Sequence, residues 1–102
     1  MIVEYIRYKI ADNQRDSFEQ AYQQAQTSLI ASVHCFGYEL SQCTEDAKYY
    51  ILRIEWDSED GHLQGFRKSP EFQAFFSAVR PFVDAIEEMR HYAVTAINSK
   101  KD

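Results

Sequence analysis

The chain has 102 residues, a formal net charge of −5, and 45% hydrophobic and 15% aromatic residues. This length fits one domain, and scattered basic residues without a stripe argue against a nucleic-acid-binding protein. No apolar run approaches the roughly 20 residues of a membrane-spanning helix. We therefore expect one cytoplasmic domain over residues 1–98 with a polar tail over 99–102, and neither nucleic acid nor a membrane as partner.

The first half of the chain predicts a strand, a helix and a hairpin. Residues 2–10 alternate between apolar and polar, as in a strand, and only Glu4 interrupts the apolar face. Residues 12–32 carry apolar side chains at helical spacing, with Asp12 or Asn13 as the expected cap. Residues 34–43 and 49–56 alternate again on either side of the polar "TEDAK", which predicts a hairpin.

The second half predicts helices and a closing strand. Residues 57–66 begin with acids but contain two glycines, so a short, marginal helix is expected. Residues 69–79 predict a firmer helix, because Ser69 is a good cap, Pro70 suits the first turn and Pro81 ends it. Residues 86–97 predict the last strand. The order βαββαβ predicts an α+β, ferredoxin-like fold: an antiparallel four-stranded sheet with helices on one face.

The sheet face away from the helices mixes charges with large side chains. Tyr5, Tyr49 and Ile51 are bulky for a solvated face, and a cross-strand pair of Arg7 with Glu55 is expected there. Such a mixed surface suits burial against a second copy of the chain, so we expect a homodimer through this face. The alternative is an ordinary wet face of an antiparallel sheet.

The two cysteines carry no sign of a metal centre. Cys35 and Cys43 lie in one predicted strand, about 26 Å apart at ~3.3 Å per residue, so they cannot pair with each other. No CxxC or Cys/His cluster indicates zinc. We expect reduced, structural thiols and no bound metal.

The stretch "IEWDSEDGHLQGFRKSPEFQAFF" (54–76), together with the element order and the closing strand, resembles the antibiotic biosynthesis monooxygenase family of dimeric α/β barrel proteins. The resemblance covers nearly the whole chain. It implies a pocket between sheet and helices, and a barrel closed by two subunits. Some members oxidise phenols, quinols or polyaromatic compounds with molecular oxygen and without a metal or organic cofactor.

This resemblance implies a set of site residues. His62, six residues after Trp56, falls about where such enzymes place a proton-handling side chain, and we expect it to be the catalytic base. His34 and His91 are the alternatives. The expected substrate-binding residues are aromatic or aliphatic and would line the pocket: Tyr8, Phe36, Tyr38, Tyr50, Leu52, Trp56, Phe66, Phe72 and Phe76.

Haem-degrading relatives of the same fold need an iron-binding His and a polar Asn where this chain has Phe76 and Ile6, so haem degradation is not expected. Three functions stay open. The first is a cofactor-independent monooxygenase acting on a small phenolic, quinol or polyaromatic substrate with molecular oxygen. The others are an isomerase on the same fold and a non-catalytic, ligand-binding or stress-related dimer.

Overall fold

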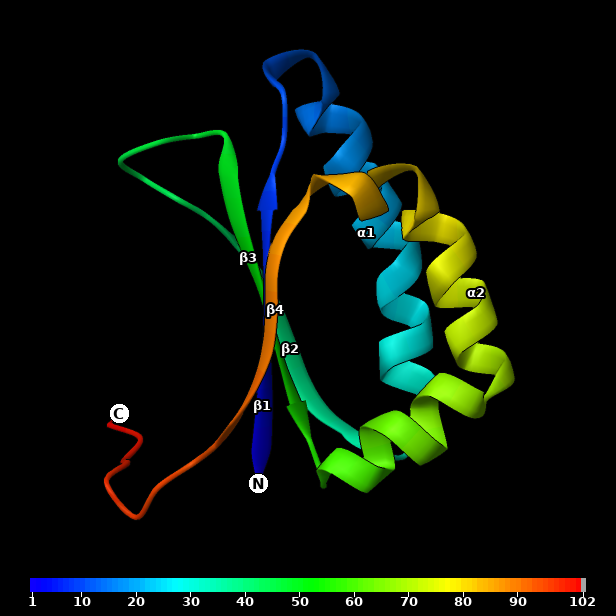
Figure 1. Cartoon of the computed structure of the whole chain (residues 1–102), viewed down its shortest axis with the longest axis vertical. Helices are drawn as coiled ribbons and strands as arrows, with labels where there is room; N and C mark the ends of the chain where they lie inside the picture. Colours follow the sequence, from blue (N-terminus) through cyan, green and yellow to red (C-terminus); the bar gives the residue numbers. More distant parts are fainter. Residues whose placement is uncertain (102) are drawn as a thin grey trace.

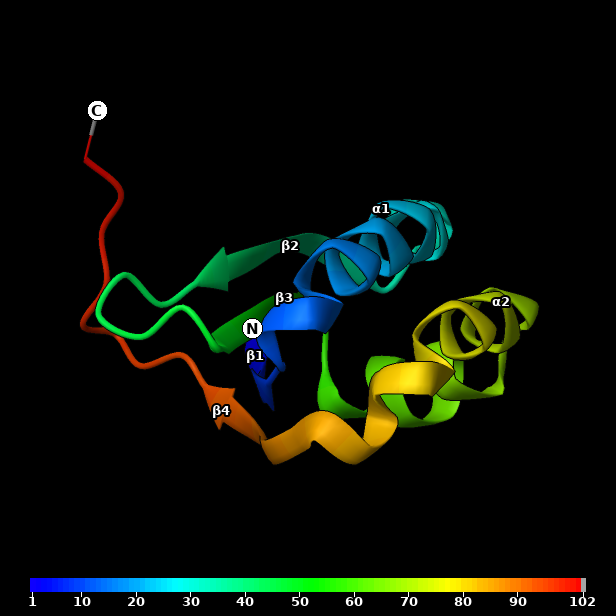
Figure 2. The same ribbon diagram turned by 90° about the horizontal axis from the view of Figure 1, so that it is seen from above.

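A computed structural model describes residues 1–101 and contains one four-stranded antiparallel sheet in the order β2-β3-β1-β4. The strands are β1 (Ile2–Lys9), β2 (Cys35–Gln42), β3 (Tyr49–Trp56) and β4 (Ile86–Ala93). The two α-helices are α1 (Arg15–Ala31) and α2 (Pro70–Val79), and both cover the same face of the sheet (Figures 1 and 2). The expected ferredoxin-like α+β fold is confirmed.

The core lies between the helices and the central strands β1 and β3. Alternate residues of β1 point inward, so Glu4, Ile6 and Tyr8 are buried while the intervening Tyr5 and Arg7 are exposed. Burying a carboxylate in this row is costly unless it finds partners. The strand pairing places Glu4 opposite Ile54 on β3 and His91 on β4.

Both helices begin near the expected residues, but only one has the expected cap. Ser69 accepts a hydrogen bond from the backbone N–H of Phe72, and α2 ends where a 3₁₀ segment, Arg80–Ala85, contains Pro81. Before α1, residues Asp12–Gln14 form a 3₁₀ turn, and no side chain caps α1. The prediction of Asp12 or Asn13 as the cap was wrong, because that turn continues directly into the helix.

A β-bulge in β2 overturns the expected placement of Phe36. The register with β3 shifts between Cys35 and Gly37, which inserts one extra residue and reverses the alternation there. Cys35 consequently packs against the core, while Phe36 is 62% exposed. Tyr38 and Leu40, beyond the bulge, keep their contact with the core.

The connection from β3 to α2 is helical, as expected, but most of it is not α-helical. It forms a π-helix, Gly61–Gly65, followed by a 3₁₀ turn, Phe66–Lys68. His34 packs over both glycines: a Cβ on Gly65 would lie 2.4 Å from His34 Nε2, and one on Gly61 would lie 1.7 Å from Asp57 Oδ1. His34 Nδ1 and Asp57 Oδ2 are 2.8 Å apart, which ties the start of β2 to the end of β3.

Two further expectations need correction. The last strand ends at Ala93 rather than 97, and residues 94–101 leave the sheet on the side away from the helices (Figure 1). Arg7 lies opposite Ile51 and forms an ion pair with Glu87, while Glu55 pairs with Arg53, so the expected Arg7–Glu55 pair was wrong. Among residues 1–101, no helix has the length and apolar character needed to cross a membrane.

Candidate functional site

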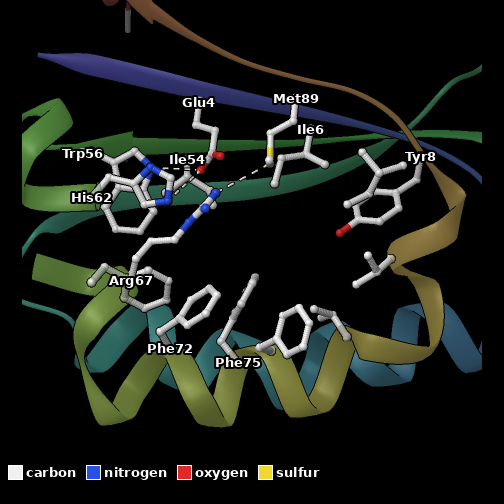
Figure 3. A pocket seen from close by; sticks show the side chains of 15 residues that line it. Glu4, Ile6, Tyr8, Ile54, Trp56, His62, Arg67, Phe72, Phe75 and Met89 are labelled. Atoms are coloured by element: carbon white, nitrogen blue, oxygen red, sulfur yellow. Dashed lines mark hydrogen bonds and ion pairs between the residues drawn. The ribbon is translucent and has the colours of Figure 1, made fainter. Parts of the chain in front are cut away.

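A cavity of about 180 Å³ lies between the sheet and α2, with the β3–α2 connection at one end (Figure 3). Its wall is almost entirely apolar and comes from β1, β3, β4, the connection and α2. An apolar cavity of about 150 Å³ in another protein holds one benzene molecule, so this one suits a single aromatic ring. The lining residues are Glu4, Ile6, Tyr8, Ile54, Trp56, His62, Phe66, Arg67, Phe72, Phe75, Phe76, Val79, Val83, Ile86 and Met89.

Four polar side chains meet at one end of this cavity. The Trp56 indole N–H donates to Glu4 Oε1 over 3.1 Å, and the His62 ring stacks on Trp56 with centroids 4.3 Å apart. His62 Nδ1 lies 2.7 Å from His91 Nε2, so one of these nitrogens donates to the other. His62 Nε2 lies 3.6 Å from Glu4 Oε1. The stack and the contacts together fix the orientation of both the imidazole and the carboxylate.

One oxygen of this cluster is unused. Glu4 Oε2 is buried and has no hydrogen-bond partner, and His91 Nε2 lies 3.9 Å from it. A buried carboxylate oxygen without a donor is unfavourable and calls for an explanation. Because Glu4 also lines the cavity, a bound molecule with a donor group would satisfy this oxygen.

Burial sets the protonation of the cluster. It raises the pKa of the Glu4 carboxyl above its ordinary value, although the hydrogen bond from Trp56 and the charges of His91 and Arg67 lower it in part. Burial, with the nearby charges of Arg67 and His91, lowers the pKa of His62 to about 3. His62 is therefore a neutral imidazole at neutral pH, and Glu4 is a stronger base than an ordinary glutamate.

Tyr8, which also lines the cavity, is held neutral. Its hydroxyl is hydrogen-bonded to that of Tyr22, and burial raises the pKa of Tyr8 to about 12. The pKa of Tyr22 is raised as well, chiefly by burial. These hydroxyls can position a ligand but are poor bases at neutral pH.

The structure brings some of the expected site residues to the cavity and leaves others elsewhere. Those that line it are Tyr8, Trp56, His62, Phe66, Phe72 and Phe76. Phe36 is turned outward by the bulge. Tyr38 donates to Gln26 and, with Leu52, lines a separate groove against α1, whereas Tyr50 is buried and donates to Glu19. The expectation that Phe36, Tyr38, Tyr50 and Leu52 line the same pocket was wrong, because β2 and the far end of β3 face α1 rather than α2.

The three histidines differ in position. His62 is only 3% exposed and points inward. His91 joins it, from β4. His34, the other alternative, contacts Asp57 and the glycines outside the cavity. Glu4 was missed as a site residue, although its carboxylate in an apolar strand face was the available signal.

The same cluster has the composition of a metal-binding set. Glu4, His62 and His91 each offer one ligand atom, and these atoms lie within 4.8 Å of one another. Two imidazoles and a carboxylate suit zinc or iron(II). A hydrogen bond between His62 Nδ1 and His91 Nε2 already engages one nitrogen of each imidazole.

Fold and site together define a small α+β domain with an aromatic cavity and a buried cluster of titratable side chains. Residues 1–78 match the family model "Antibiotic biosynthesis monooxygenase", and the chain belongs to this family. The resemblance seen in the sequence is thereby confirmed. The uncharacterized protein YczJ of Bacillus subtilis (strain 168) is 27% identical over 92 residues, spanning 90% of this chain and 97% of its own.

Solved structures share the fold. A protein from Bordetella bronchiseptica assigned to the antibiotic biosynthesis monooxygenases superposes with a TM-score of 0.74 at 23% identity, covering 92% of this chain and 96% of its own. Another so assigned, from Deinococcus radiodurans, has a TM-score of 0.76 at 14% identity, covering 99% and 100%. At these identities the likeness establishes architecture and not substrate.

Proposed function

We propose that this protein is a cofactor-independent monooxygenase that oxidises a small phenol or quinol with molecular oxygen. The observation that carries the proposal is the buried, unpartnered Oε2 of Glu4, a residue that lines a mainly apolar cavity that fits one aromatic ring. The family to which the chain belongs supports it.

The proposed chemistry begins with a proton transfer. The substrate hydroxyl donates to Glu4 Oε2, and the raised pKa of Glu4 makes this carboxylate the base, in place of His62. His62 and Trp56 hold Oε1 and so aim Oε2 at the ring. The substrate anion then reduces oxygen far more readily than the neutral phenol does.

Oxygen insertion balances without an external reductant. The substrate loses four electrons in total: one oxygen atom forms a bond to its ring carbon, and the other leaves as water with two protons from the substrate. A hydroquinone thereby becomes a hydroxyquinone. The apolar wall of Phe66, Phe72 and Phe75 keeps water from the reactive intermediate.

A homodimer through the outer sheet face is part of the proposal. This face exposes Tyr5 and Tyr92, which contact each other edge-on, and the chain after β4 continues on the same side (Figure 1). Aromatic side chains beside charges are typical of subunit interfaces. A cytoplasmic location is likewise proposed.

The test is oxygen uptake by chelator-treated protein with a panel of hydroquinones and anthrone-like phenols. We expect uptake to persist in the chelator and to fall about a hundredfold in Glu4→Gln, the size expected for loss of a general base. Glu45→Gln, an exposed carboxylate in the β2–β3 turn, is the matched control and should retain full activity.

The other outcomes discriminate between functions. Uptake that the chelator abolishes would replace this mechanism with one using a metal at Glu4, His62 and His91. Ligand binding without any uptake would favour the non-catalytic dimer or the isomerase.

A further inference from the structure

Arg67 lies at the polar end of the cavity, and no step of the proposed chemistry uses it. It follows Phe66 in the 3₁₀ turn between the π-helix and α2, and its side chain lines the cavity (Figure 3). Its guanidinium carbon lies 5.8 Å from the centre of the Phe72 ring, and Nη2 lies 4.0 Å from Met89 Sδ. A cation–π contact and a weak hydrogen bond, made to different elements, therefore hold the exposed Arg67 side chain beside Glu4 and His62.

This arginine has no acidic partner among residues 1–101. Arg7, Arg15, Arg53 and Arg90 each form an ion pair with a neighbouring carboxylate, whereas Arg67 and the exposed Arg80 form none within 4.0 Å. Of these two, only Arg67 lines the cavity. A thioether sulfur is only a weak acceptor. The guanidinium fork is thus left with donors for a planar, anionic group, which it binds better than any other side chain does.

Two groups that lack a complementary partner in the protein therefore lie at one end of the cavity. Glu4 Oε2 is an acceptor that lacks a donor, and Arg67 is a set of donors that lacks an anion. The two side chains do not form an ion pair with each other, so neither satisfies the other. A flat ligand that offers a hydroxyl to one and an anion to the other would satisfy both.

We propose that the ligand is a one-ring aromatic hydroxy acid, with its hydroxyl donating to Glu4 and its carboxylate accepting from Arg67. The hydroxyl and carboxylate sit near each other on the ring, as in 2- or 3-hydroxybenzoate, because both protein groups lie at the same end of the cavity. The ring itself occupies the space beside Trp56 and Phe75. The inference that this ligand is a substrate rests on the proposed oxygenase function. That the ligand binds in the cavity can be tested independently of that function.

The test is direct binding without oxygen, followed by the fluorescence of Trp56, the single tryptophan, which lines the cavity. The probes are phenol, benzoate and the three hydroxybenzoates. We expect 2- or 3-hydroxybenzoate to bind at least tenfold more tightly than phenol or benzoate, and 4-hydroxybenzoate, whose groups point to opposite ends, to bind more weakly.

Three variants separate the charge from the packing of Arg67. Arg67→Met should weaken hydroxybenzoate binding at least tenfold and leave phenol binding unchanged. Arg67→Lys keeps the charge without the fork and should lie between wild type and Arg67→Met. Arg80→Met removes an equal charge from an exposed residue outside the cavity and should change nothing.

Either of two results would overturn the inference. One is a wild-type protein that does not prefer the hydroxybenzoates to phenol. The other is an Arg67→Met variant whose affinity for phenol and for hydroxybenzoate falls equally, which would mean that Arg67 only packs against the cavity. If the Met variant fails to fold, Arg67→Lys provides the same comparison. Tight binding of hydroxybenzoates without oxygen uptake would support the ligand class and refute the oxygenase, whereas oxygen uptake with phenols by a protein that does not prefer hydroxybenzoates would do the opposite.

Discussion

At the scale of single residues, the site depends on a histidine that stays neutral because it is buried. His62 stacks on Trp56 and hydrogen-bonds to His91, and its pKa of about 3 lies well below the ordinary 6.5. As pH falls below 6.5, the unfolded chain takes up a proton on this residue that the folded protein refuses. The free energy of unfolding should therefore fall between pH 6.5 and 3, by up to about 1.4 kcal/mol per pH unit from His62 alone.

The measurement is urea unfolding at several pH values from 5 to 7, with His62→Gln beside wild type. The variant lacks this titration, so its free energy of unfolding should depend less steeply on pH, even though it is less stable overall. Glu4, with its raised pKa, opposes the trend in both proteins. Equal slopes in the two proteins would refute a depressed pKa for His62.

The histidine that the sequence indicates as the base differs from the residue that the structure favours for that role. His62 is the histidine that the sequence indicates, but a group with a pKa near 3 is too weak a base to deprotonate a phenol efficiently. The buried Glu4, whose pKa is raised, is better suited. In the proposed mechanism His62 is consequently a positioning residue.

At the scale of elements, the β3–α2 connection depends on glycines that admit a neighbouring ring. Gly65 lies so close to His34 that a methyl group would overlap the imidazole. We expect Gly65→Ala to lower the free energy of unfolding by about 1–3 kcal/mol, the usual cost of overpacking. Thermal or urea unfolding measures this directly.

A double-mutant cycle identifies the cause. His34→Ala alone should destabilise the protein, because it removes the contact with Asp57. In the His34→Ala background, however, Gly65→Ala should cost almost nothing, since the space is then open and alanine is the better helix former. An undiminished cost in that background would mean that the π-helix backbone, rather than His34, requires glycine.

At the scale of the whole molecule, one face of the sheet is covered by helices and the other exposes aromatic side chains. Tyr5 and Tyr92 lie on adjacent strands of the uncovered face. In the proposed homodimer both would be buried, so Tyr5→Glu combined with Tyr92→Glu should convert a dimer of twice 12.0 kDa into a monomer. Light scattering after size-exclusion chromatography would show the change in mass.

A control variant tests whether added charge alone, on the helix side of the molecule, changes the mass. Gln20→Glu and Gln24→Glu, which add the same charge on the exposed side of α1, should leave the mass unchanged. A monomeric wild-type protein, or a dimer that persists in the Tyr5/Tyr92 variant, would exclude this face as the interface.

Sequence patterns alone determined the architecture of this protein. Alternation placed the β3 strand at its observed bounds, and Ser69 and Pro70 placed the start of α2, because strand and helix periodicity and capping are local properties. The family signature after Trp56 also identified His62 and much of the cavity wall. Even Glu4 was visible as an exception to its strand's apolar pattern.

Tertiary structure decided what these residues do together. Glu4 and His62 are far apart in the chain, and only the pairing of β1 with β3 and β4 brings Glu4, Trp56 and His91 to one point. Gly37 is a local signal for the bulge, because a glycine inside a strand often marks one, but only the pairing with β3 decides that Phe36 turns outward. Burial, which depends on every packed element at once, sets the protonation states on which the proposed chemistry rests.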